Sequence, residues 1–197
     1  MPLPPRVYDR TLNSEIERLL YQVKVIRMEA EGLVWGLNDE RFNWTPEAGR
    51  WSMAQCFDHL NITNRLMITQ LEDAMQRGRA AGKLSDGPYT YGFVGRWFLR
   101  MMQPPVKRRF KAPKPFQPAL RKKLEEVLPE WGRTHDRVAE LIREANGLDL
   151  ERIKVVSPAT KLLKYNLGIA FWVQTTHDRR HLWQAREVRN QQRFPQA

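Results

Sequence analysis

The chain has 197 residues, a length that suits one domain and is too short for two domains of full size. Hydrophobic residues make up 42% of it, close to the globular average, so a sizeable core can form and disorder of the whole chain is not expected. The formal net charge is +11 at pH 7, which bears on partners and solubility but not on the fold.

Cysteine content and hydropathy indicate the cellular compartment of the protein. Cys56 is the only cysteine, which excludes an intramolecular disulfide and favours a reducing compartment. The first residues contain no apolar stretch of the kind found in signal peptides. The longest uncharged run, residues 165–176, is well short of the roughly 20 residues that a membrane-spanning helix needs. We therefore expect a cytoplasmic protein.

Helical periodicity is clear in four segments, whereas few segments alternate as strands do. The first predicted helix covers about residues 11–37 and ends near Asn38 and Asp39. Its apolar residues recur at steps of three and four, which places them on one stripe as in a bundle helix. The stripe consists of Leu12, Ile16, Leu19, Val23, Ile26, Ala30, Leu33 and Leu37.

The second predicted helix begins at Ser52 and ends near Gly78. Ser52 and Gln55 have the spacing of a capping box, in which each side chain satisfies a backbone N–H of the other residue. Trp51 and Cys56 occupy the flanking positions at which apolar residues often pack together. A helix start at this position is therefore well marked.

Two further helices are predicted at about residues 118–147 and 166–190. Pro118 suits the first position of a helix, whereas Pro129 predicts a kink or a break inside it. In the last helix one face contains Ala170, Val173, His177, His181, Gln184 and Val188.

These segments predict an all-α fold, an antiparallel four-helix bundle, built as a single domain over residues 1–197. Residues 78–118 form a long connection after the second helix. This connection is rich in glycine and proline, and connections of such length are usually functional or pack as a substructure of their own.

The histidines are the candidate chemical groups. His177 and His181 are four residues apart on one helix face, which allows two imidazoles to bind one ion, although two core histidines with hydrogen-bonded nitrogens would show the same spacing. His59 falls on the flank of the second helix, where it can face a groove. His135 lies in the apolar stripe of the third helix. It could be a fourth metal ligand, a proton carrier or a core residue, so we do not include it in the predicted site.

Three motifs together resemble the DinB-like (YfiT-like) superfamily of metalloenzymes. They are Asn43-Trp44-Thr45-Pro46, the stretch from Trp51-Ser52 to Asp58-His59-Leu60, and His177-Asp178-Arg179-Arg180-His181 with Gln184 shortly after. The resemblance implies an up-down-down-up bundle, often a homodimer. It also implies a divalent ion, which we expect to be zinc or nickel, bound by His59, His177 and His181.

The resemblance implies two kinds of reaction on a small-molecule substrate. One is hydrolysis, and the other is transfer or isomerisation that depends on a low-molecular-weight thiol. Gln184 shares the face of the histidine pair and either orients an imidazole or a bound water or is a polar residue on the helix flank. The family often has glutamate where this chain has Gln55, so a nearby negative charge is lost, although glutamine caps a helix equally well.

The connection is also the most basic part of the chain. Residues 77–118 contain ten Lys or Arg residues and one acid, Asp86, which gives a net charge of +9, and seven aromatic residues lie among them. This pattern is typical of segments that bind single-stranded nucleic acid or an anionic membrane surface. The segment could equally form a wall of the active site that favours acidic substrates. The fourth alternative is an ordered segment whose aromatic side chains pack on the bundle while its charges are solvated. The alternative to an enzyme is therefore a non-catalytic module that uses this segment on nucleic acid or a membrane.

Overall fold

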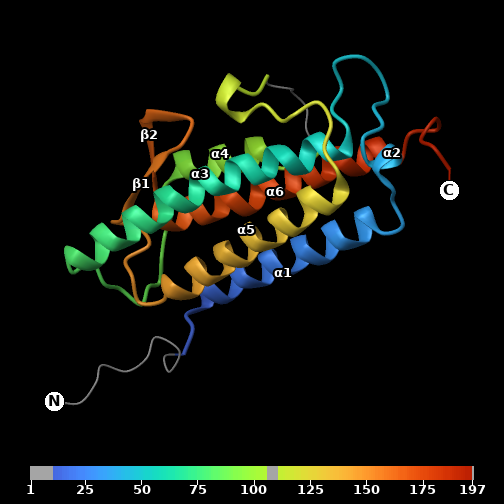
Figure 1. The fold of residues 1–197 in the computed structure, drawn as a ribbon. Helices are drawn as coiled ribbons and strands as arrows, with labels where there is room; N and C mark the ends of the chain where they lie inside the picture. Colours follow the sequence, from blue (N-terminus) through green and yellow to red (C-terminus); the bar gives the residue numbers. More distant parts are fainter. Residues whose placement is uncertain (1–10, 106–110, 197) are drawn as a thin grey trace.

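The computed structural model describes residues 11–105 and 111–196, and four long helices dominate it (Figure 1). They are α1 (Ser14–Val34), α3 (Met53–Ala80), α5 (Leu124–Glu144) and α6 (Leu167–Arg189). Both α1 and α3 pack against α5 and α6. Helices α1 and α6 run in one direction, whereas α3 and α5 run in the other (Figure 1). The predicted helical fold is thus confirmed in its main features.

Shorter elements connect and flank the long helices. They are α2 (Asp39–Phe42), α4 (Phe93–Met102), the 3-10 turn η2 (Lys114–Phe116), and the strands β1 (Lys154–Ser157) and β2 (Thr160–Asn166). The connection after α3 therefore contains ordered structure, in agreement with the expectation that it packs as a substructure of its own. Its residues 107–110, with three of the predicted cations and Phe110, lie outside the described residues.

The hairpin of β1 and β2 corrects the all-α prediction. Its strands pair antiparallel, with Val155 opposite Tyr165, and both of these side chains are buried in the core. The rest of β2 is mostly exposed, so only a few positions follow the alternation that identifies a strand. The pattern was too short to be recognised in the sequence.

Side-chain caps set the starts of three long helices. Asn13 accepts hydrogen bonds from the N–H groups of Glu15 and Ile16 at the start of α1, and Asn166 accepts one from the Ile169 N–H at the start of α6. The predicted capping box of Ser52 and Gln55 is present at the start of α3.

The start of α5 differs from the prediction, because the helix begins at Leu124 and not at residue 118. Backbone groups before it are bound elsewhere: the Ala119 N–H donates to Asp58, and Lys122 exchanges two hydrogen bonds with the Asn43 side chain. A segment held by such contacts cannot also form helical hydrogen bonds. The predicted break at Pro129 is absent, since α5 continues past it.

The core fills the space between the long helices and agrees with the predicted stripes. In α1 the buried apolar residues are Ile16, Leu19, Val23, Ile26, Ala30 and Leu33, all of them from the predicted set. Among the described residues, no helix combines the length and the apolar character needed to cross a bilayer.

Candidate metal centre

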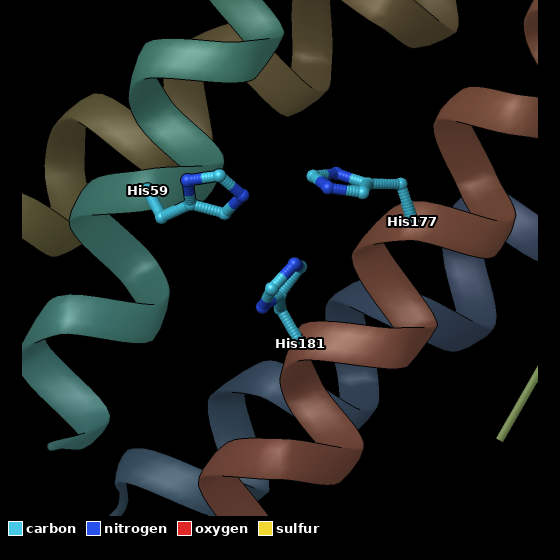
Figure 2. Close-up of side chains that lie close together, drawn as sticks. All are labelled: His59, His177 and His181. Carbon is cyan, nitrogen blue, oxygen red and sulfur yellow. The ribbon is translucent and has the colours of Figure 1, made fainter. Parts of the chain in front are cut away.

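Three histidine side chains from two helices meet between α3 and α6. Figure 2 shows His59 of α3 and the pair His177 and His181 of α6 pointing toward one another. Their ring centroids are 4.5–5.2 Å apart, and one nitrogen of each ring lies within 4.8 Å of the others. The structure thus brings together the three residues that the sequence predicted for the site.

The backbone fixes the orientation of the His59 ring. Its Nδ1 lies 2.6 Å from the carbonyl oxygen of Phe116, which can only accept, so Nδ1 carries the proton and donates it. The other nitrogen, Nε2, then keeps a free lone pair, which is the state that a metal ligand needs. His59 is only 5% exposed and is therefore more deeply buried than its flank position predicted.

The Phe116 carbonyl belongs to the connection after α3, which returns to cover this end of the bundle. The Asp58 carboxylate accepts a hydrogen bond of 2.8 Å from the Ala119 N–H and so holds the segment next to His59. Sequence reasoning missed this role of Phe116, because a backbone carbonyl leaves no signal in the sequence. The connection thus contributes a hydrogen-bond partner to His59.

Burial keeps all three imidazoles uncharged at neutral pH. Desolvation is the main cause in each case: it lowers the pKa of His59 and His181 below the usual value and that of His177 to about 3. The mutual repulsion of the rings and the charge of Arg180 lower the pKa of His177 and His181 further. Gln184, one turn further along α6, acts on the pKa of His181 in the opposite direction.

Trp51 forms an aromatic wall beside the cluster. Its ring is stacked with His181 at 5.7 Å between centroids and lies 4.9 Å from that of His59. Trp51 immediately precedes the cap of α3, so the start of the helix positions both the wall and the histidine. The sequence predicted Trp51 as a packing residue but not this contact.

The donor set fits a divalent transition metal. Three neutral nitrogen ligands with one position left for water or substrate are typical of catalytic zinc sites. His181 Nδ1 is also buried without a hydrogen-bond partner among the described residues, so the protein alone leaves a polar atom unsatisfied there. Cys56 does not contribute, because its thiol is buried among apolar side chains and burial raises its pKa.

His135 lies outside the cluster, in a separate buried group between α3, α5 and α6. Its ring stacks on Trp131, and its Nε2 is 3.8 Å from the carboxylate of Asp178. Burial lowers the pKa of His135 to about 4 and raises that of Asp178 to about 8, so both are neutral near pH 7 and do not form an ion pair. Gln174 donates to Asp178 and Asn64 and joins the group to α3.

Comparison with protein families gives an independent result. The family model described as the DinB superfamily matches residues 22–185, a range that includes all three histidines of the cluster. No curated protein and no solved structure matches the chain. Since the family match covers most of the sequence, this chain belongs to the DinB superfamily.

Proposed function

We propose that this protein is a metal-dependent enzyme that binds one divalent ion, zinc or nickel, through His59, His177 and His181. The observation that supports this most strongly is the convergence of three uncharged imidazoles from two helices on one point. A buried cluster of neutral rings has little structural purpose, because each ring leaves polar atoms to be satisfied.

Such an ion, when bound, would supply a Lewis acid that lowers the pKa of a water or thiol placed on it. The residues of the chain orient the ligands, shield the ion and influence which substrate binds. Phe116 holds His59 in the tautomer that presents Nε2, and Trp51 shields one side from water. Arg180, next to His181 in α6, places a positive charge near the cluster, which favours a substrate with an anionic group.

The two proposed reaction types, hydrolysis and thiol-dependent transfer, differ in the nucleophile. The chain has no cysteine other than Cys56, which is fully buried in the core. A thiol in the reaction must therefore come from a second, low-molecular-weight substrate. As the family resemblance implies, we also propose that the enzyme is a homodimer.

Metal content of untagged protein tests the proposal. Dialysed against zinc or nickel and then freed of excess ion, the wild type should retain one ion per chain, measured by elemental analysis. His181→Ala should retain almost none, while circular dichroism shows that its helices are intact. His135→Asn is the matched control, because it removes a histidine outside the cluster and should retain one ion. Equal retention by His181→Ala and the wild type would refute the site.

A further inference from the structure

We infer that the exposed face of α4 binds the surface of an anionic lipid membrane. The α4 ridge, defined as Phe93, Trp97 and Met101, is spaced by four residues and so forms one stripe. These side chains are 73%, 54% and 45% exposed. Three large apolar side chains in a row on one helix face are uncommon on a surface without a partner.

The orientation of the ridge is fixed by the opposite face of α4. Phe98 lies 5.9 Å from Tyr165 of β2, measured between ring centroids. Gly95 sits so close to α6 that a Cβ there would lie 2.9 Å from the side chain of Ile169. Since α4 is packed against α6 and β2 along this face, the ridge faces away from the bundle.

Positive charge flanks the ridge. The side chains of Arg96 and Arg100 are exposed, and neither forms an ion pair or a hydrogen bond with a described residue. The sequence contains no Asp or Glu between Asp86 and Glu125. Glu151 accepts a hydrogen bond from the Thr90 N–H, before the helix begins.

The hairpin next to α4 repeats the same combination. Leu162 is 96% exposed, and Lys161 and Lys164 on either side are exposed as well. The contact between Phe98 and Tyr165 places this strand directly beside α4. Two neighbouring elements thus present apolar side chains among cations.

A lipid surface matches this combination better than a protein partner does. The ridge lies on the outer face of α4, and α4 lines neither the groove beside Arg77 and Ile153 nor the groove beside Tyr21 and Trp172. Headgroups of anionic lipids attract arginine and lysine, while aromatic and apolar side chains enter the boundary with the acyl chains. The protein's net charge of +11 adds long-range attraction.

Co-sedimentation of the full chain with vesicles tests this inference. Vesicles of phosphatidylcholine with about 30 mol% phosphatidylserine should bind the protein at about 50 mM salt, and pure phosphatidylcholine should bind it at least about fivefold less. Trp97→Ser should reduce binding to the anionic vesicles at least about fivefold, because it removes a large apolar side chain that the proposal places in the membrane. The variant Arg96→Gln with Arg100→Gln should also bind them less.

Trp35→Ser is the matched control. Trp35 is 82% exposed but lies at the other end of the bundle, where Arg189 of α6 donates to its carbonyl. Its loss should leave vesicle binding unchanged. Absence of binding by the wild type, or equal binding by the two serine variants, would overturn the inference. Self-association that Trp97→Ser abolishes, without any binding to vesicles, would instead assign the ridge to a protein contact.

Discussion

At the scale of single residues, the site depends on imidazoles that burial keeps uncharged. A histidine side chain exposed to water has a pKa of about 6.5. In this protein desolvation lowers the pKa of His177 to about 3 and shifts those of His59 and His181 in the same direction. Neutral rings are ready to bind a cation, but they also make the folded state sensitive to acid.

The metal-free protein should therefore lose stability as the pH falls below 6.5. Below this pH the histidines of the unfolded chain bind protons, whereas the buried histidines of the folded chain stay neutral. Each such proton lowers the free energy of unfolding by about 1.4 kcal/mol per pH unit. Asp178 acts in the opposite direction, because its raised pKa of about 8 means that the folded state binds the extra proton between about pH 4 and 8. The several histidines outweigh this one acid.

Urea unfolding of chelator-treated protein at pH 7 and pH 5 measures the effect. We expect a lower free energy of unfolding at pH 5, and a smaller difference in His177→Gln, which removes one of the neutral rings. A free energy that is equal at both pH values would contradict the buried, uncharged state of the cluster.

A second prediction concerns Asp58, which binds no metal in the proposal but holds the Ala119 N–H and so the segment with the Phe116 carbonyl. Asp58→Ala should free that segment and weaken zinc binding about 10- to 100-fold, as loss of groups that orient metal ligands typically does. Titration with a competing chelator measures the affinity. Asp73→Ala, at an exposed position in the same helix, should have no effect. Equal affinities in the two variants would show that His59 is oriented without this anchor.

At the scale of elements, the start of α3 places the site. The capping box fixes the first turn, with Trp51 just before it and His59 two turns further on. Periodicity and caps predicted the long helices well, because both act locally. They did not predict the extended segment before α5 or the hairpin, because these form through contacts between residues far apart in the sequence, such as Lys122 with Asn43.

The cap of α3 should contribute measurably to stability. Ser52 is fully buried and its hydroxyl accepts the Gln55 N–H at 3.1 Å, so Ser52→Ala should lower the free energy of unfolding by about 1–2 kcal/mol. Thermal or urea unfolding measures this loss. Ser14→Ala is the control, because Ser14 is exposed and the α1 cap is Asn13. A loss of similar size in both variants would contradict the capping role.

At the scale of the whole molecule, the candidate site joins two helices that are far apart in the sequence. His59 comes from α3 and the other two histidines from α6, and the connection after α3 contributes Phe116. The family resemblance predicted the three histidines together, whereas helical spacing alone gave only the pair His177 and His181. The Phe116 carbonyl and the stacking of Trp51 required the structure, since each depends on how distant segments pack.

X-ray absorption spectroscopy of the zinc-loaded protein tests the central claim most directly, because it identifies the atoms bound to the ion. The account predicts three imidazole nitrogens at about 2.0–2.1 Å and no sulfur neighbour at about 2.3 Å. In His59→Ala any ion that remains should show no more than two imidazoles. A wild-type spectrum with fewer than three imidazoles, or with sulfur bound to zinc, would contradict the account.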